Sequence, residues 1–522
     1  MKKYSNNWFW FICISVILFA CSLRATEPAK PNILFIIVDD LMPRIGVYGD
    51  DQAITPNMDR LGNAGTVFLR AYSQQALCSP SRVSFLTGLR PDSHYEVRTS
   101  QRMRTLNPDV VSMPEYFAQN GYGTKGMGKV FDGRTVVNND EPSWTEPYFS
   151  SWNPDFPGPQ GSPVAHYYQN PKLKAKYAED EGNEVSPWWK ERNRLLAMGM
   201  RPAVEAEDIP DAAYFDGLMG DEAKDYLIDY ASGDQDEPFF LTVGFLKPHL
   251  PFVAPKKYWD LYDRNAIELA ALPGYPVGAP EIAQNDYHEI KDYNTSAGEF
   301  GAYSPDVQRE LIHGYLACVS YVDAQVGKLM KTLVEKGLAD DTIIVLVGDH
   351  GFHLGDKGEW GKHTNYEEAN HVPLMFYTPG MPRGIRCDQP VELIDIFPTL
   401  IDLAGLPLLP ELPGESLRVA LEGKPLPEPT FAISQYIRKG SMGYSIRDER
   451  YRYIEWRKAG TDRKSVEEVS GEVIARELYD YGKATDSSGE KVNLINDPQY
   501  ATVIDRLQQE LATTLNYLPT AK

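Results

Sequence analysis

Two short apolar runs, each ending in acidic or metal-binding side chains, stand out along the chain. Residues 32–40 read NILFIIVDD, and residues 340–350 read DDTIIVLVGDH. A run that is apolar at every position is typical of a strand buried on both faces of a parallel sheet. Because open α/β sheets place their ligands beyond the carboxyl ends of the strands, both polar ends are predicted to lie at one site.

Amphipathic stretches between these runs predict helices. Residues 113–122 (MPEYFAQNGY) place their apolar side chains on one face, and residues 311–337 form a long amphipathic stretch that is closed by Gly337. Alternation of strands with helices of this kind favours an α/β sandwich.

The pattern changes near residue 425. Residues 430–437, 443–456 and 476–481 alternate in the manner of antiparallel strands, and residues 498–518 predict a closing helix. We therefore expect a main domain over residues 31–424. A smaller C-terminal α/β subdomain with an antiparallel sheet is expected over residues 425–522.

Two long stretches fit neither pattern. Residues 140–190 and 272–305 are rich in Pro, Gly, Asn and aromatic residues. Loops of this length in a compact domain are usually functional rims or lids. Their Trp and Tyr side chains could stack on sugar faces, but packing of a long loop explains them equally well.

Composition restricts the classes of partner. The chain has 522 residues, of which 42% are hydrophobic, and a formal net charge of -21. Such an acidic body is not that of a nucleic-acid-binding protein, which would carry a basic surface. A polyanionic ligand would have to meet a local cluster of cations.

The amino terminus predicts export. Residues 1–21 combine two lysines with an apolar run over residues 8–20, which suits a signal peptide better than a membrane span. The four residues ending in Cys21 resemble a bacterial lipobox, so Cys21 would carry a lipid anchor; a plain secretory signal is the alternative. Residues 22–30 would be a linker, and the protein would lie in the periplasm or at the cell surface.

The two acidic strand ends suggest a metal site. Adjacent acids such as Asp39 and Asp40 are costly to bury unless a cation neutralises them, and Asp349 with His350 would add further ligands. Oxygen ligands favour Ca²⁺ or Mg²⁺, although His is less typical of either. Turn or N-cap roles would explain one such pair, but less easily two on matching strands.

Cys78 begins a stretch that bears on this site. There are only five cysteines, of which Cys318 is expected to be a core thiol, and a lone cysteine is more often a small buried hydrophobe than a nucleophile. Residues 78–88, CSPSRVSFLTG, nevertheless match the signature Cys-x-Pro-Ser-Arg, four residues, Thr-Gly.

With this motif, the chain resembles the type I (formylglycine-dependent) sulfatases of the alkaline-phosphatase-like superfamily, and is most similar among them to iduronate-2-sulfatases. Further matching stretches cover residues 31–400 in order: NILFIIVDDL, QQALCSPSRVSFLTG, MGKVF, FLKPHLPF, SYVDAQVG, TIIVLVGDHG, LGDKGEWGKHTNYE and HVPLMFYTPG. The resemblance implies an alkaline-phosphatase-like sandwich, with a large mixed sheet between helices. The C-terminal subdomain is matched more loosely.

The resemblance also implies how Cys78 would act. A formylglycine-generating (sulfatase-maturating) enzyme would oxidise it to formylglycine (3-oxoalanine), recognising Pro80 and Arg82, and the aldehyde hydrate would be the nucleophile. Arg82 would also hold the modified side chain and the metal-site acids in place. One Ca²⁺ would be bound by Asp39, Asp40, Cys78, Asp349 and His350.

Four more residues are implied by their motif positions. Lys129, Lys247 and Lys362 would line the sulfate oxygens, and His249 would be the general acid. Fixed cations lower the barrier where charge develops on those oxygens, and a sugar alkoxide is a poor leaving group that needs a proton. A divalent ion would also acidify the nucleophilic hydroxyl. By contrast, His353 and His371 are expected to be structural.

The implied function is removal of sulfate from a sulfated saccharide, such as a uronate-containing glycosaminoglycan or an ulvan-type algal glycan. One departure concerns Asp132, where similar chains have a His that contacts the formylglycine hydroxyls. Two alternatives remain: a phosphodiester or phosphonate monoester hydrolase of the same superfamily, and a catalytically silent glycan-binding lipoprotein.

Overall fold

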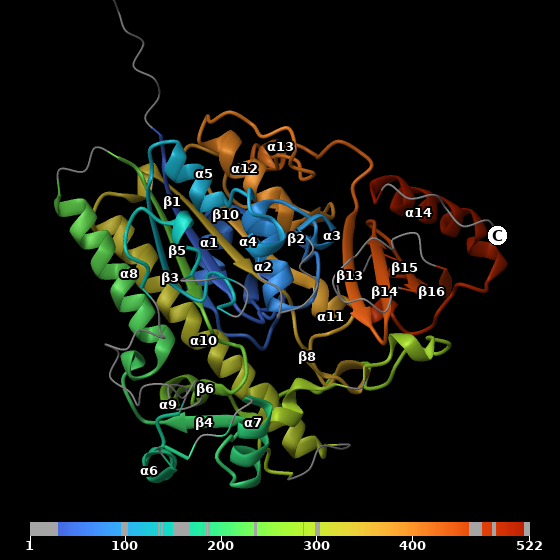
Figure 1. Ribbon diagram of the computed structural model, residues 1–522, viewed down its shortest axis with the longest axis horizontal. Coiled ribbons are helices and arrows are strands. Elements are labelled where there is room, and N and C mark those ends of the chain that lie inside the picture. Colours follow the sequence, from blue (N-terminus) through green and yellow to red (C-terminus); the bar gives the residue numbers. More distant parts are fainter. Residues whose placement is uncertain are drawn as a thin grey trace, which may run out of the picture. The chain divides into compact units, whose positions relative to one another are not determined.

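A computed structural model describes most of the chain (Figure 1). The residues described are 30–94, 103–133, 136, 139–149, 168–180, 182–183, 185, 188–233, 237–285, 287–297, 303–458, 472–482 and 487–515. The predicted signal peptide, Cys21 and nearly all of the predicted linker lie outside these residues. So do residues 151–167 of the first long loop.

The centre of the fold is a mixed eight-stranded sheet, in the order β11-β2-β10-β7-β1-β5-β3 with β12 also paired to β2. Its central strand β1 pairs in parallel with β5 and β7, whereas β10 is antiparallel to both of its neighbours. The strands are β1 (Asn32–Val38), β2 (Thr66–Tyr72), β3 (Gly123–Gly128), β5 (Phe239–Phe245), β7 (Thr342–Gly348), β10 (His371–Tyr377), β11 (Ile385–Cys387) and β12 (Val391–Glu392). Both apolar runs of the sequence are therefore strands, as predicted.

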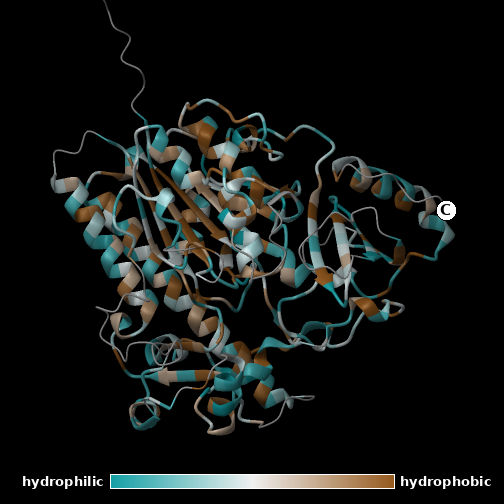
Figure 2. Cartoon of the chain, viewed as in Figure 1, coloured by the Kyte–Doolittle hydropathy of each residue, from teal (hydrophilic) through white to brown (hydrophobic). Residues whose placement is uncertain are grey.

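Helices cover both faces of this sheet, and alternate residues of β1 serve the two cores. Leu34, Ile36 and Val38 pack with α1 (Pro56–Ala64), α8 (Phe215–Ser232) and α10 (Pro305–Glu335). Ile33, Phe35 and Ile37 pack with α2 (Cys78–Thr87), α5 (Met113–Gln119) and α12 (Ile396–Leu403). In Figure 2 the central strands are accordingly brown, while the helices carry both colours. The predicted sandwich with a large mixed sheet is confirmed.

Helix α10 begins earlier than its apolar pattern indicates. The Ser304 side chain accepts the N–H of Val307, and Pro305 occupies the first helical position. Both are ordinary helix-start signals. The six added residues belong to the helix because its cap lies upstream of the first amphipathic turn.

The C-terminal part forms a four-stranded antiparallel sheet, as predicted, of β13 (Ala432–Arg438), β14 (Ser441–Arg447), β15 (Tyr451–Lys458) and β16 (Val473–Asp480). One face packs on α14 (Ala501–Thr514), and the other on Tyr366 and Ala283. The single predicted stretch 443–456 is in fact parts of two strands, joined by a turn in which Asp448 N donates to Tyr451 O. The division at residue 424 remains a prediction.

The long loops are partly helical, which corrects the expectation for residues 140–190. This stretch contains α6 (Pro171–Asp180) and the start of α7 (Trp188–Ala197). Leu173 and Tyr177 of α6 are buried one turn apart, which is the spacing of a helix face. Residues 272–305 instead contain short 3-10 turns, including Glu281–Ala283 and Glu289–Asp292.

The remaining elements are short. They are α3 (Pro91–His94), α4 (Met103–Leu106), β4 (Val204–Glu207), β6 (Phe252–Pro255), α9 (Lys256–Trp259), β8 (His353–Leu354), β9 (Trp360–Gly361), α11 (Glu367–Asn370) and α13 (Arg418–Leu421). Within the described ranges, none of the helices combines the length and apolar character needed to cross a bilayer.

Candidate active site

The candidate site lies at the carboxyl edge of four parallel strands. Val38 of β1 is paired with Phe245 of β5 and Gly348 of β7, so Asp39 and Asp349 follow at the same level. Their backbone N–H groups continue the ladder, with Asp39 N 3.2 Å from Phe245 O and Asp349 N 3.2 Å from Val38 O. The two strand ends thus meet, as their sequence pattern predicts.

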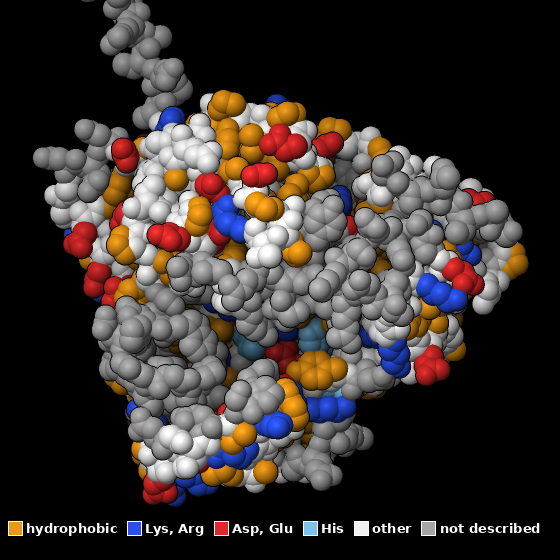
Figure 3. All heavy atoms as spheres, viewed as in Figure 1, with side chains coloured by type: hydrophobic (Ala, Val, Ile, Leu, Met, Phe, Trp, Pro, Cys, Tyr) orange, Lys and Arg blue, Asp and Glu red, His pale blue; other side chains and the backbone are white. Residues whose placement is uncertain are grey.

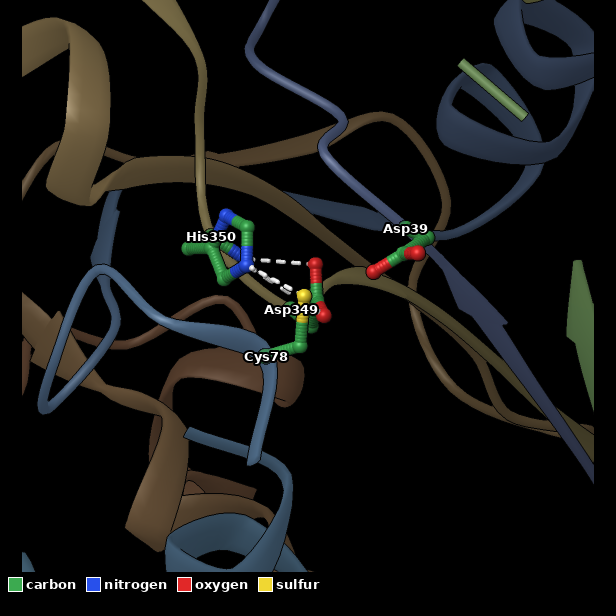
Figure 4. A group of neighbouring side chains, drawn as sticks. All are labelled: Asp39, Cys78, Asp349 and His350. Atoms are coloured by element: carbon green, nitrogen blue, oxygen red, sulfur yellow. Dashed lines mark hydrogen bonds and ion pairs between the residues drawn. The ribbon is translucent and has the colours of Figure 1, made fainter. Parts of the chain in front are cut away.

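Cys78 is the first residue of helix α2 and is buried against this edge. Its Sγ lies 3.3 Å from His350 Nε2 and 3.4 Å from Lys362 Nζ. Figure 4 shows Cys78, Asp349 and His350 gathered together, with Asp39 beside them. Burial and the Asp39 charge raise the pKa of the Cys78 thiol to about 11. The thiol itself is therefore protonated at neutral pH and is not an activated nucleophile.

Arg82 lies one helical turn after Cys78 and ties the acids together. Its Nε donates to Asp349 Oδ2 at 2.8 Å, and its Nη2 donates to Asp39 Oδ1 at 3.1 Å. The remaining Nη1 donates to the carbonyls of Lys129 and Val130. All three charged side chains are fully buried, so this guanidinium fixes the positions of both acids.

Two lysines bring further positive charge to the acid pair. Lys129 Nζ lies 2.5 Å from Asp39 Oδ2, and Lys362 Nζ lies 2.7 Å from Asp40 Oδ1. Burial opposes ionisation of Asp39, but Lys129 and Arg82 prevail and hold its pKa well below the ordinary value. Burial raises the pKa of Asp40 well above its ordinary value, Lys362 opposes this and Asp39 adds to it.

The arrangement fits a hard divalent cation. Asp39, Cys78, Asp349 and His350 present ligand atoms that all lie within 4.8 Å of one another. Asp40 Oδ2 is buried and accepts no hydrogen bond from any residue that the structure describes. A cation there would satisfy this oxygen and offset the crowding of three carboxylates, which favours Ca²⁺ or Mg²⁺ by ligand type.

Lys247 and His249 lie on the loop that follows β5. The backbone N–H groups of Leu246 and Lys247 donate to the two carboxylate oxygens of Asp216 in α8, at 2.8 and 2.7 Å. Lys247 Nζ donates to the carbonyls of His249 and Pro251 at 2.6 and 2.7 Å. Burial lowers the pKa of Lys247. In this conformation Lys247 therefore braces the loop that carries His249.

His249 is the candidate proton donor and is held through one ring nitrogen. Its Nδ1 lies 2.5 Å from Leu250 O, and its Nε2 lies 3.3 Å from Glu289 Oε1. Burial and the Lys362 charge lower the pKa of His249 to about 3, whereas Glu289 acts in the opposite direction. Glu289 thus favours a second proton on the His249 ring, which burial and Lys362 disfavour.

Asp216 and Glu289 are site residues that the sequence did not indicate. Asp216 lies inside a helix, and Glu289 lies in a 3-10 turn of the loop 272–305. Neither has a motif of its own. The only signal for Glu289 was the expectation that this long loop forms a functional rim.

The other residues singled out by sequence lie as follows. Asp132 is buried and acts electrostatically on Lys129. His353 Nε2 lies 2.8 Å from Thr364 Oγ1, and His371 Nε2 lies 2.8 Å from Leu69 O. These two histidines thus contact structural partners, in keeping with the role expected for them.

The molecular surface is hollowed on the face shown in Figure 3. His and acidic side chains, in pale blue and red, lie at the bottom of this hollow. The site residues are mostly buried, with His249 and Lys129 exposing 17% and 18% of their side chains. Both side chains are therefore within reach of an incoming ligand.

Two family models match the chain. One, described as Sulfatase, matches residues 31–406, and one described as N-sulphoglucosamine sulphohydrolase, C-terminal, matches residues 355–516. Among curated proteins, iduronate 2-sulfatase of Mus musculus is 33% identical over 95% of this chain and 96% of its own. That of Homo sapiens is 35% identical over 81% and 84%. An ulvan-active sulfatase of Formosa agariphila is 26% identical over 85% and 77%.

Solved structures match over nearly the whole chain. A phosphonate monoester hydrolase of Agrobacterium radiobacter has a TM-score of 0.68 at 23% identity, covering 93% of this chain and 96% of its own. A protein in complex with its substrate D-glucosamine-2-N,6-O-disulfate also has a TM-score of 0.68, at 20% identity, covering 94% and 98%. At these identities the likeness shows the alkaline-phosphatase-like fold.

Proposed function

The chain belongs to the sulfatase family and is a sulfuric ester hydrolase, and we propose that it removes sulfate from a saccharide that contains a uronate. The observation that carries the proposal is the match to iduronate 2-sulfatases over 95% of the chain. The similarity to an ulvan-active sulfatase points to the same class of sugar. Glycosaminoglycan or ulvan-type oligosaccharides are therefore the proposed substrates.

We propose that residue 78 acts as formylglycine rather than as cysteine. Once formed by a maturating enzyme, this group supplies a hydrate hydroxyl as the nucleophile. The high pKa of the buried thiol supports the need for conversion. Cys78 begins α2 beside His350 and Lys362, and Arg82 fixes the surrounding acids. Its position would therefore be held by residues already in place.

The proposed metal is one Ca²⁺, held by Asp39, Asp40, Asp349, His350 and the modified residue 78. When bound, it supplies positive charge beside the reacting hydroxyl and sulfate oxygens. Arg82 contacts two of the acids, and its charge favours their ionised forms, although burial raises the pKa of Asp349 above its ordinary value.

The remaining roles belong to the cations around the opening. Lys129 and Lys362 carry their positive charges next to Cys78 and would bind the sulfate oxygens, where charge grows during cleavage. His249 in its doubly protonated form would pass its Nε2 proton to the sugar oxygen as the bond to sulfur breaks, so substrate binding would have to raise the low pKa of this ring. Lys247 would either reach the sulfate after a change of rotamer or serve by bracing the loop.

The phosphonate monoester hydrolase alternative shares this fold and requires a direct comparison. The test compares nitrophenyl sulfate with nitrophenyl phosphate and a nitrophenyl phosphonate, using protein co-expressed with a formylglycine-generating enzyme. We expect faster release from the sulfate ester, and mass spectrometry should show the aldehyde at residue 78. Preference for a phosphorus ester would overturn the proposal, as would activity with unmodified cysteine.

A catalytically silent glycan-binding protein is the other alternative, suggested by Asp132 in place of His. Asp132 lies near Lys129, where a carboxylate could accept a hydrogen bond from the hydrate. Release of inorganic sulfate from any sulfated disaccharide excludes this alternative. Asp132→His then tests whether the departure tunes the rate or the choice of sugar.

We also propose that the protein is exported and anchored through Cys21. The support is the basic and apolar pattern of residues 1–21. Metabolic labelling with a radioactive fatty acid should mark the wild-type protein and leave a Cys21→Ser variant unlabelled. Equal labelling of both, or of neither, would remove the anchor from the proposal.

A further inference from the structure

Glu289 contacts two of the proposed substrate-binding groups at once. Its Oε1 lies 3.3 Å from His249 Nε2, and its Oε2 lies 3.3 Å from Lys362 Nζ. Glu289 is the first residue of a short turn in the loop 272–305, and its side chain is 13% exposed. A carboxylate thus stands between the proposed proton donor and a proposed sulfate-binding lysine.

His249 has only one edge that a substrate can use. Its Nδ1 faces Leu250 O at 2.5 Å, and a carbonyl oxygen can only accept a hydrogen bond, so Nδ1 carries a proton that is already engaged. The free nitrogen, Nε2, is the atom that faces Glu289. A sugar oxygen that takes a proton from His249 must therefore approach where the carboxylate lies.

Glu289 also lies where a sulfate oxygen would reach Lys362. Its Nζ donates to Asp40 Oδ1 at 2.7 Å and lies 3.4 Å from Cys78 Sγ. The contact with Glu289 Oε2 takes up a further direction around this ammonium group. A sulfate oxygen reaching both Lys362 and residue 78 would meet the Glu289 carboxylate.

The Glu289 carboxylate and a sulfate ester cannot both occupy this position, because both are negatively charged. Burial favours the neutral acid, but Lys362, His249 and His363 hold the pKa of Glu289 at about 2, so it is an anion at neutral pH. A sulfate ester is also an anion. Two negative charges that compete for the same Lys362 ammonium group repel strongly in a partly buried site.

We propose that Glu289 is an internal anion that occupies the sulfate position of the free enzyme and is displaced when a sulfate ester binds. The inference rests on the roles proposed above for His249 and Lys362. It makes Glu289 a specificity-determining residue, because only a ligand that presents an anionic group to Lys362 and His249 replaces the contacts that Glu289 gives up.

The displacement requires only the side chain to rotate, because the backbone around it is anchored. On one side, His288 Nδ1 lies 3.0 Å from Glu359 Oε2. On the other side, Arg192 Nη1 lies 2.8 Å from Asp292 Oδ1. Glu289 lies between these two fixed points, and a Glu side chain can swing away about its own bonds.

The test is the affinity for inorganic sulfate, measured by calorimetry on the full-length matured protein. Glu289→Gln keeps the shape and removes the charge, so the dissociation constant for sulfate should fall about tenfold, or about 1.4 kcal/mol. The control is Glu281→Gln, an exposed position in the same loop, which should leave the affinity unchanged. Unchanged or weaker sulfate binding by Glu289→Gln would overturn the inference.

A structure of the wild-type protein with sulfate bound tests the inference without any variant. The sulfate should contact Lys362 Nζ and His249 Nε2, with the Glu289 carboxylate turned away from both. Sulfate bound while Glu289 keeps both contacts would contradict the proposal. Neither readout needs turnover, so a failure to cleave any sulfate ester would count against the proposed function and leave this inference to its own result.

Discussion

At the scale of single residues, the site is built around carboxylates that could not be buried alone. Asp39 and Asp349 share the guanidinium of Arg82, and Asp39 also meets Lys129. Each acid thus has a fixed cation, as buried charges require. Asp40 has Lys362 on one oxygen, and its other oxygen is buried without a hydrogen-bond partner among the described residues.

The role of His249 can be separated from that of the lysines by changing the leaving group. A sugar alkoxide needs a proton as it departs, whereas nitrophenolate is stable without one. We expect His249→Gln to lower kcat for a saccharide sulfate by about a hundredfold and to affect nitrophenyl sulfate much less. Steady-state kinetics on both esters checks this.

Lys362→Gln serves as the comparison, because the lysine would contact the sulfate in every ester. It should lower the rate on both substrates alike. Equal losses on both esters for His249→Gln would show that this residue does not act as the proton donor.

At the scale of elements, strands position the acids, helix α2 positions Arg82, and a loop positions Lys247 and His249. Asp39 and Asp349 follow directly from paired strands, while Lys247 and His249 depend on the loop after β5. This loop is fixed to helix α8 through Asp216, which accepts two of its backbone N–H groups. Asp216, inside helix α8, thus orients the loop that follows β5.

Asp216 gives this anchor a pH dependence. Burial raises its pKa from 3.8 to about 6, although the two N–H groups oppose the rise. Asp216 therefore binds a proton more tightly in the folded state than in the unfolded state. Its contribution to the free energy of unfolding is full below pH 3.8 and is lost as the pH rises through about 6. The loss should amount to roughly 3 kcal/mol of unfolding free energy, at about 1.4 kcal/mol per pKa unit.

Urea unfolding of the wild type and Asp216→Asn across this pH window measures the effect. The asparagine side chain does not titrate, so the difference in stability between the two proteins should shift in favour of Asp216→Asn as the pH rises. Parallel pH profiles would contradict a raised pKa at this position.

Arg452 joins the C-terminal sheet to the catalytic part. It lies in β15, is fully buried, pairs with Glu367 at the start of α11, and lies 3.4 Å from Glu490. Arg452→Met leaves both acids buried without this partner, which should cost about 3–5 kcal/mol of unfolding free energy. Denaturant unfolding monitored by tryptophan fluorescence measures the loss.

Arg450 offers a matched control in the turn just before the same strand. It pairs with Asp480 but is 54% exposed, so Arg450→Met should cost no more than about 1 kcal/mol. If both substitutions had the same small effect, the buried network would not hold the two parts together.

The sequence alone predicted those features that depend on residues adjacent in the chain. The run before Asp39 is apolar at every position because β1 serves two cores, and the motif around Cys78 is contiguous on α2. Asp216 and Glu289 were not predicted, because each acts on groups far away in the chain and has no local pattern.

Residues 140–190 were expected to form a loop, but they contain helix α6 and the start of α7. The Pro and Gly content of the whole stretch concealed a short amphipathic segment, in which Leu173 and Tyr177 bury one face of α6. Composition averaged over fifty residues is a poor guide when a helix occupies only ten of them. Helix periodicity would have been the better signal.

At the scale of the whole molecule, a chain with a net charge of -21 would bind the proposed anionic substrate through a small group of buried cations. A divalent metal would add to them. We expect removal of metal by a chelator to lower the melting temperature and the activity, and Ca²⁺ to restore both. Saturation at about a hundred times Kd would add about 2.7 kcal/mol of stability.

Scanning calorimetry of the chelated protein, with and without added Ca²⁺, checks this expectation. The Asp40→Asn variant should show a smaller calcium-dependent shift, because it loses one proposed ligand charge. An identical melting temperature with and without the ion in the wild type would mean that the acid cluster holds no Ca²⁺.

Residue 78 is proposed to drive the removal of sulfate from a uronate-containing saccharide. The most direct measurement is ion chromatography of the inorganic sulfate released from defined disaccharides, with and without a uronate, each carrying one sulfate. The matured wild-type protein should release sulfate from a uronate-containing disaccharide, and Cys78→Ala should release none. Release only from disaccharides without a uronate would contradict the proposed substrate, and equal release by Cys78→Ala would contradict the role of residue 78.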